Sequence, residues 1–286
     1  MIKARAKSLF ILPAAGLCAV LLLVSLALAL RTGPERLAWL GAAMTALPLP
    51  ATLLHLLLSR APRASENAPL ALFIAALGIL LTVWEWQIER VADWPAFAVA
   101  VVCLSLLLLY VFWYSRFGRI ASGKLDVGNK LPEFTLTDID GNAAHSTDLL
   151  GKPAVLLFYR GNWCPLCMAQ AAEIAARYQE FADLGISVAL ISPQSEAHSR
   201  SLAEKLNVPF RFWVDQGSRV AAALDIAVSH GVPAWIGGNY ASDTVMPTVV
   251  VCNANGTIVF ADQTDNYRLR PDIFLAILKR SGAIAQ

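Results

Sequence analysis

The segment Phe158-Tyr-Arg-Gly-Asn-Trp-Cys-Pro-Leu-Cys167 decides the fold of this chain. It follows an apolar run at Ala154–Leu157 that predicts a buried strand, and a helical pattern continues from Met168 to Leu184. The two cysteines are therefore expected where a strand gives way to a helix. A helix N-terminus carries free N–H groups and the positive end of the helix dipole, which stabilise a thiolate. A Cys-x-x-Cys pair at such a turn is typical of a redox site.

The composition of the chain indicates membrane segments. Of the 286 residues, 57% are hydrophobic and only 15% are charged, whereas about a quarter is usual in soluble proteins. The first 114 residues hold 8 of the 23 Lys and Arg residues and 5 of the 21 Asp and Glu residues. The rest of the chain has the composition of one globular domain. The net charge of +2 and the lack of a basic stripe exclude a nucleic-acid partner.

Four apolar runs in the first part predict four transmembrane helices, because each is close to the roughly 20 residues that a spanning helix needs. The first has a basic start like a signal peptide, but it is long enough to span a bilayer. Buried helices of a soluble domain are the alternative. We predict spans at 1–115, a juxtamembrane linker at 116–127 and a redox domain at 128–286. The four runs are Ser8–Leu30, Leu37–Leu58, Ala68–Trp86 and Trp94–Tyr114.

The basic residues beside these runs predict the orientation of a multi-pass protein in the cell membrane. Eight lie on the side of both termini, against three on the other side. Because basic loops remain in the cytoplasm, the redox domain is predicted to face the cytoplasm. Within the spans, Glu85 and His55 are read as interfacial or paired groups, with an intramembrane function as the alternative. The basic residues on the first side are Lys3, Arg5, Lys7, Arg60, Arg63, Arg116, Arg119 and Lys124, and those on the other are Arg31, Arg36 and Arg90.

The second part of the chain alternates strands and helices and then ends in a hairpin and a helix. This order predicts a parallel core that is extended by an antiparallel pair. Asp140-Gly141 and Asn253-Ala-Asn-Gly256 are turn signals. The predicted strands begin at Phe134, Ala154, Ile186, Phe210, Thr248 and Thr257, and the predicted helices are Met168–Leu184, Ser195–Leu206, Ser218–Leu224 and Pro271–Lys279.

This order, with the cysteine pair at the first strand-to-helix turn and Met246-Pro-Thr248 before a late strand, resembles the thioredoxin fold over Gly128–Lys279. Within that fold the chain is similar to the AhpC/TSA peroxiredoxin-like family, which the segments at 138–141, 158–167 and 265–271 carry. The fold class that follows is an α/β thioredoxin-like fold, a central mixed sheet flanked by helices, preceded by a transmembrane helical bundle. The resemblance implies that Cys164 is the nucleophile and that Pro247 is cis and faces it.

The chain departs from this family at one place. Typical members carry Pro-x-x-x-Thr-x-x-Cys, in which the threonine hydroxyl helps to hold the peroxide. Here the matching positions are Leu157 and Gly161. The set of groups that activates a peroxide is therefore incomplete, and Cys167 instead matches the partner cysteine of thioredoxins.

Cys164 and Cys167 suit a two-step reaction. The cysteine nearer the helix start attacks as a thiolate, and the second, one helical turn later, resolves the resulting sulfenic acid or mixed disulfide. A zinc site would need two further ligands, and the histidines are scattered. An inert buried pair is the other alternative. No metal or organic cofactor is implied.

Three further arginines and a proline are candidate site residues. Arg160 either stabilises the thiolate and orients a peroxide oxygen or is a solvated turn residue. Arg268 and Arg270 are read as surface ion-pairing residues, with a place in the site as the alternative. Pro247 is assigned to the site on the resemblance, with an ordinary proline at the start of a strand as the alternative. Gln194, which follows a predicted strand, is read as loop structure.

Three functions remain open on the sequence. The leading one is a membrane-anchored, antioxidant thiol peroxidase that takes a hydroperoxide and is reduced by a thioredoxin-like or small-thiol donor. The second is a thiol–disulfide oxidoreductase that acts on protein disulfides. The third is a transporter or electron-relay protein in which the transmembrane helices carry the function and the redox domain only docks. It would need polar residues in facing spans, or membrane cysteines placed for thiol–disulfide exchange. Cys18 and Cys103 are each isolated among Leu and Val, which disfavours this third function.

Overall fold

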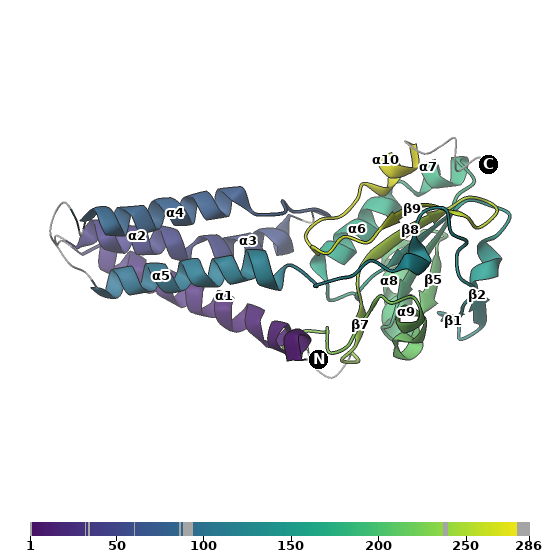
Figure 1. Cartoon of the computed structure of the whole chain (residues 1–286), viewed down its shortest axis with the longest axis horizontal. Helices are drawn as coiled ribbons and strands as arrows, with labels where there is room; N and C mark the ends of the chain where they lie inside the picture. Colours follow the sequence, from purple (N-terminus) through teal and green to yellow (C-terminus); the bar gives the residue numbers. More distant parts are fainter. Residues whose placement is uncertain are drawn as a thin grey trace. The chain divides into compact units, whose positions relative to one another are not determined.

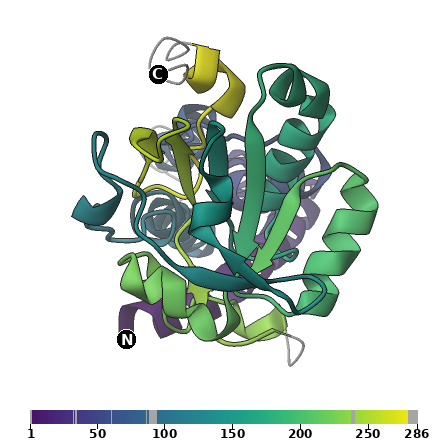
Figure 2. The same ribbon diagram turned by 90° about the vertical axis from the view of Figure 1, so that its right-hand side faces the viewer.

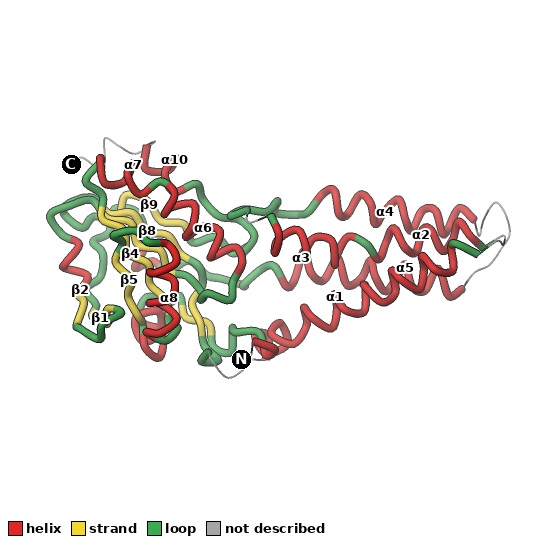
Figure 3. Tube along the Cα trace, turned by 180° about the vertical axis from the view of Figure 1, so that it is seen from behind, coloured by secondary structure: helices red, strands yellow, loops and turns green. Residues whose placement is uncertain are grey.

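A computed structural model describes residues 2–31, 33, 35–59, 61–85, 87, 94–236 and 240–278 of the chain (Figure 1). It divides into two compact units. The helical unit comprises Leu9–Ser59 and Ala64–Arg116, and the sheet unit comprises Phe117–Gln286 together with Met1–Ser8 and Arg60–Arg63. The described strands all belong to the sheet unit, as the tube in Figure 3 shows.

The helical unit contains three helices that are long and apolar enough to cross a membrane: Arg5–Ala29, Arg36–Leu58 and Trp94–Tyr114. The fourth predicted span corresponds to a 16-residue apolar helix, Pro69–Trp84, which is shorter than the usual spanning length. Four spans therefore stay a prediction. The helices are α1 (Ile2–Ala29), α2 (Arg36–Ala46), α3 (Pro48–Leu58), α4 (Pro69–Trp84) and α5 (Trp94–Leu108), which continues as the π-helical turn η2 (Leu109–Tyr114).

Small residues allow α2 and α4 to pack closely. A Cβ added at Gly41 would lie 2.5 Å from the backbone oxygen of Gly78, which leaves no room for a side chain. Thr45 also donates its hydroxyl hydrogen bond within this crossing, to the Gly41 carbonyl at 2.9 Å. Glu85 is buried at the end of α4, and His55 is exposed on α3. Trp86, Arg60 and Arg90 lie outside the described residues.

The sheet unit is built on a mixed seven-stranded sheet, which confirms the predicted fold class. Strands β3, β4 and β5 are parallel, and β8 pairs antiparallel with β3 and with β9. The order β4-β3-β8-β9, which ends at one edge of the sheet, is the arrangement of the thioredoxin fold. The full order is β2-β1-β5-β4-β3-β8-β9, with bounds β1 Thr135–Asp138, β2 Ala143–His145, β3 Ala154–Phe158, β4 Ser187–Ser192, β5 Arg211–Val214, β8 Thr248–Cys252 and β9 Ile258–Asp262.

Strand β3 lies at the centre of the core, because all five of its side chains are buried. Leu156 and Phe158 join one apolar cluster with Ile191, Trp213 and Val250 from neighbouring strands. Helices lie on both sides of the sheet (Figure 2). A strand buried on both faces is uniformly apolar, and for this reason the apolar run at 154–158 predicts a buried strand.

The helices of the sheet unit follow the prediction with one exception. The predicted helix Met168–Leu184 begins earlier, at Pro165, and is interrupted at Arg177. Ser195 caps its helix as predicted, with its hydroxyl oxygen accepting from the backbone N–H of His198. The bounds are α6 Pro165–Ala176, α7 Tyr178–Asp183, α8 Glu196–Leu206, α9 Arg219–Ala223 and α10 Ile273–Leu278. Lys279, the last residue of the predicted closing helix, lies outside the described residues.

A small second sheet, β6 (Ala227–Val228) with β7 (Thr244–Val245), has no counterpart in the prediction. These two-residue strands pair antiparallel. They are too short to leave a periodic signal in the sequence. Their pairing brings Thr244 and the loop at Gly231 next to Arg160, as described below.

Candidate active site

The two cysteines lie where the sequence predicts them, at the start of α6. Strand β3 ends at Phe158, a short turn follows, and Cys164 is the N-cap residue of the helix. Pro165 occupies the first helical position, where its missing N–H loses no partner. Cys167 is therefore on the first turn of α6, where the positive end of the helix dipole is strongest.

Both thiols are buried and free of disulfides, with Cys164 4% exposed and Cys167 1% exposed. Hydrogen bonding from the Cys167 thiol lowers the pKa of Cys164 to about 6, and the charges of Arg160 and Arg270 act in the same direction. Burial and the neighbouring Cys164 raise the pKa of Cys167 well above its ordinary value. At neutral pH the pair is therefore a Cys164 thiolate beside a Cys167 thiol. Within the described residues, no set of three His, Cys, Asp or Glu residues is grouped as a metal site.

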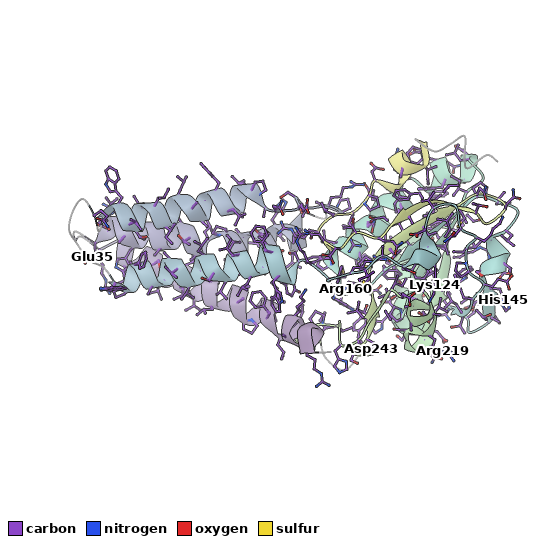
Figure 4. The ribbon with its side chains drawn as sticks, viewed as in Figure 1. Glu35, Lys124, His145, Arg160, Arg219 and Asp243 are labelled. Atoms are coloured by element: carbon purple, nitrogen blue, oxygen red, sulfur yellow. The ribbon has the colours of Figure 1, made fainter. Side chains whose placement is uncertain are left out.

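Arg160 is held in place from three sides. Its Nη2 donates to the Gly231 carbonyl at 2.6 Å, and its own carbonyl accepts from the Thr244 hydroxyl at 2.8 Å. Its guanidinium carbon lies 4.4 Å from the centre of the Trp163 ring and 5.8 Å from that of Phe117, which are cation–π distances. Arg160, labelled in Figure 4, is thus held by its neighbours rather than solvated at a turn, and its charge lowers the pKa of Cys164.

Arg270 reaches the second sulfur. Its Nη2 lies 3.7 Å from Cys167 Sγ, and the residue is 8% exposed. Arg268 is 2% exposed. The interpretation of both arginines as surface ion-pairing residues is therefore wrong. The sequence contained one signal, the conspicuous segment at 265–271, but nothing in it distinguished an inward from an outward arginine.

Gln194 holds the turn that carries the cysteines, a role that the interpretation of this residue as loop structure did not include. Its Oε1 accepts from the backbone N–H of Asn162 at 2.9 Å, and its Nε2 donates to the Tyr159 hydroxyl at 2.9 Å. The turn also contains Gly161 at φ +143°, where a Cβ would lie 2.7 Å from Trp163 Nε1. Gln194 directly follows the parallel strand β4, so it emerges at the same edge of the sheet as the turn after β3.

We expect Gln194→Ala to lower the free energy of unfolding by about 1–3 kcal/mol, because the half-buried N–H of Asn162 loses its acceptor and the buried Tyr159 hydroxyl loses its donor. If Gln194 has only a structural role, this loss of stability is the only effect expected. A positioning role predicts in addition that the pH midpoint for alkylation of Cys164 moves upward from about 6. Iodoacetamide kinetics against pH, together with thermal unfolding, measure the two effects. Gln179→Ala, on the exposed face of α7, is the matched control. If the pH midpoint for alkylation of Cys164 is unchanged in the Gln194 variant, Gln194 has only a structural role.

Pro247 is buried at the start of β8, whose Thr248 pairs with Phe158 at the end of the sheet where the cysteine turn begins. The prediction of a cis bond at Pro247 is wrong, because Met246–Pro247 is trans. The trans form is the more stable by about 0.5–1 kcal/mol, and the segment satisfies its hydrogen bonds in this extended form. Met246 N–H donates to Ile226 at 2.7 Å, and Arg119 donates to the Pro247 carbonyl at 3.1 Å.

Comparison with known proteins places this site in a family. Residues 127–261 match the model of the AhpC/TSA family. Peroxiredoxin Q of Oryza sativa subsp. japonica chloroplasts is 34% identical over 102 residues, which are 36% of this chain and 47% of that protein. A Coxiella burnetii protein described as a bcp peroxiredoxin is 30% identical over 104 residues, 36% of this chain and 69% of that protein.

The solved structures that resemble the chain include peroxidoxin BcpB from Mycobacterium tuberculosis, with 22% identity and a TM-score of 0.47 over 57% of this chain and 99% of that one. The chain spans about half the length of the chloroplast peroxiredoxins it matches. The family match covers both cysteines, Arg160 and Pro247 and ends before Arg270. The chain therefore belongs to the AhpC/TSA peroxiredoxin family, with its family domain at residues 127–261.

Proposed function

We propose that this chain is a membrane-anchored thiol peroxidase that reduces hydroperoxides through Cys164 and Cys167. The observation that carries the proposal is the paired state of the two sulfurs, with a lowered pKa for Cys164 and a raised pKa for Cys167. A thiolate is the nucleophile in peroxide reduction, and a protonated neighbour remains available for the second step. Family membership supports the same chemistry.

In the proposed cycle, the Cys164 thiolate attacks one peroxide oxygen and the O–O bond breaks. The sulfur becomes a sulfenic acid, and the other oxygen leaves as an alcohol or water after it takes a proton. The Cys167 sulfur then loses its proton and attacks Cys164. The S–S bond forms as hydroxide leaves, and this takes up the proton to give water. A thioredoxin-like or small-thiol donor returns the disulfide to two thiols by two exchange steps.

The arginines have separate roles in this cycle. Arg160 stabilises the Cys164 thiolate and the negative charge on the departing oxygen. Arg270 acts on Cys167, whose ionisation burial opposes. Because it contacts the sulfur directly, we assign Arg270 as a catalytic residue for the second step.

The second candidate is a thiol–disulfide oxidoreductase acting on protein disulfides. It is favoured by the Cys-x-x-Cys spacing, which closes a disulfide within one helical turn, and by the absence of the family threonine at Gly161. The same two sulfurs would act, and Cys164 would attack a disulfide sulfur instead of an oxygen.

A rate comparison separates the two candidates. We expect hydrogen peroxide or cumene hydroperoxide to oxidise Cys164 of the reduced full-length chain about 100-fold or more faster than free cysteine at pH 7, since oriented cations stabilise the departing oxygen. The lowered pKa alone is insufficient, because a less basic thiolate is also a weaker nucleophile. Stopped-flow thiol loss gives the rate, and the exchange rate with a peptide disulfide is the comparison. A peroxide rate equal to that of free cysteine would leave the disulfide function standing.

For the helical unit we propose a multi-pass anchor in the cell membrane, with the sheet unit on the cytoplasmic side. The three helices of spanning length support insertion, and we propose the shorter apolar helix α4 as the fourth span. The division into spans at 1–115, a linker at 116–127 and a redox domain at 128–286 belongs to this proposal. The excess of basic residues beside the chain termini supports the orientation.

A further inference from the structure

A second pair of cysteines meets inside the helical unit. Cys18 lies on α1 and Cys103 on α5, and the two residues belong to one buried cluster, where each thiol influences the ionisation of the other. Both residues are 0% exposed. Each is near the middle of a helix of spanning length, Arg5–Ala29 for the first and Trp94–Tyr114 for the second. The sequence, in which each cysteine is isolated, gave no indication of this contact.

Aromatic contacts between α1 and η2, the continuation of α5, agree with an antiparallel course of the two segments. Near the start of α1, Phe10 packs edge-on against Trp113 with ring centres 5.5 Å apart, and its ring centre is 5.8 Å from that of Tyr114. Two turns further along α1 and three turns back along the partner helix, the thiols meet. The aromatic contacts and the two cysteines therefore lie on the same facing sides of α1 and of the α5–η2 segment.

The surroundings of the pair are apolar. Cys18 and Cys103 belong to a buried cluster with Ala14, Leu107 and Tyr110. Within the described residues no third His, Cys, Asp or Glu joins them as a metal ligand. The third cysteine outside the active site, Cys252, is buried in β8 and serves as the comparison, because burial alone raises the pKa of its thiol. Four of the five cysteines thus form two interacting pairs.

We propose that Cys18 and Cys103 are a second redox-active dithiol, which a lipid-soluble quinone oxidises to a disulfide within the chain. Two S–H bonds break and one S–S bond forms, and the two electrons and two protons convert the quinone to a quinol. A quinone is the chemical class that fits, because the thiols are shielded from water within helices of membrane-spanning length and the reaction removes two electrons. Charged, water-soluble disulfides do not enter such surroundings. The proposal is independent of the function proposed for Cys164 and Cys167.

The test uses the full chain with Cys164, Cys167 and Cys252 replaced by serine, so that only the helical pair remains. All three replacements lie in the sheet unit, so the helices keep their packing. The reduced protein in lipid vesicles is treated with decylubiquinone. We expect one mole of quinol per mole of chain, and the loss of both maleimide-reactive thiols after denaturation until a reductant restores them. The same protein with Cys18→Ser is the matched control and should give neither result.

Copper phenanthroline oxidises neighbouring thiols to a disulfide without needing a specific binding site. It therefore distinguishes a pair that the quinone does not oxidise from two thiols that are not neighbours. If it closes the bond and the quinone does not, the thiols are neighbours without the proposed redox role. If neither closes the bond, the contact itself is refuted. Disulfides that join two chains rather than closing within one would also overturn the proposal.

Discussion

Cys164→Ser is expected to abolish hydroperoxide reduction, with a fall of about 1,000-fold or more in the rate, because a serine hydroxyl is not ionised at neutral pH and is a poor nucleophile. The effect should be much larger than that of any other single replacement in the chain. Cys164 has the only thiol whose pKa is lowered among the described residues of the sheet unit. The other two thiols there are held protonated by burial.

Cys167→Ser should behave differently, since it removes the second step and leaves the first. One equivalent of peroxide is consumed, a sulfenic acid accumulates at Cys164, and dimedone traps it for detection by mass spectrometry. Cys252→Ser is the matched control, because burial raises the pKa of that thiol to about 12 and it should be silent. Peroxide consumption by Cys164→Ser at the wild-type rate would place the chemistry on another sulfur.

The pH dependence of the first step has a defined sign. Since the pKa of Cys164 is lowered to about 6, the thiolate fraction rises with pH through that value and is nearly complete above pH 7. The rate of sulfenic acid formation should therefore rise between pH 5 and 7 and then level off. A free thiol would continue to gain reactivity up to about pH 8.5.

The parts of the fold that the sequence predicts are those that neighbouring residues determine. Strand β3 is apolar at every position, Ser195 caps α8, and the turn at Asn253–Gly256 joins β8 to β9. Each of these depends on residues within one element or one turn. The interruption of the long helix at Arg177 has no such local signal in the sequence. In the structure the guanidinium of Arg177 lies 3.7 Å from the ring centre of Phe274, which is distant in the chain.

The candidate site divides in the same way. Cys164, Cys167 and Arg160 belong to one segment, so a motif identifies them together. Gln194 reaches that segment from 35 residues away and Arg270 from 103 residues away. A single sequence contains no sign of which distant polar residue the fold turns inward, and Arg268 and Arg270 read alike. Cys18 and Cys103 are the hardest residues to predict as a pair. They lie on separate helices, and only the register of the two helices shows that they are neighbours.

Arg270→Met is expected to slow disulfide formation about 10- to 100-fold while the oxidation of Cys164 slows much less. A hydrogen bond from a charged donor contributes about 1.5–3 kcal/mol, and 1.4 kcal/mol corresponds to a tenfold change in rate. The cation contacts Cys167 directly at 3.7 Å, and it acts on Cys164 only as the weaker of the two arginine charges. The loss therefore falls on the step in which Cys167 must ionise.

The two steps are separated in a single-turnover experiment, because sulfenic acid appears first and the disulfide follows. In the variant, dimedone should capture a larger share of Cys164, and the pH at which disulfide formation reaches half its maximum should move upward, since removal of the cation raises the pKa of Cys167 further. Arg270→Lys retains the charge and should recover part of the rate, although it cannot reproduce the planar fork of donors. Arg219→Met on α9 removes an arginine of the same domain that contacts neither sulfur in the described structure. If Arg270→Met slows both steps equally, the arginine serves the whole site as a general positive charge and has no particular role at Cys167.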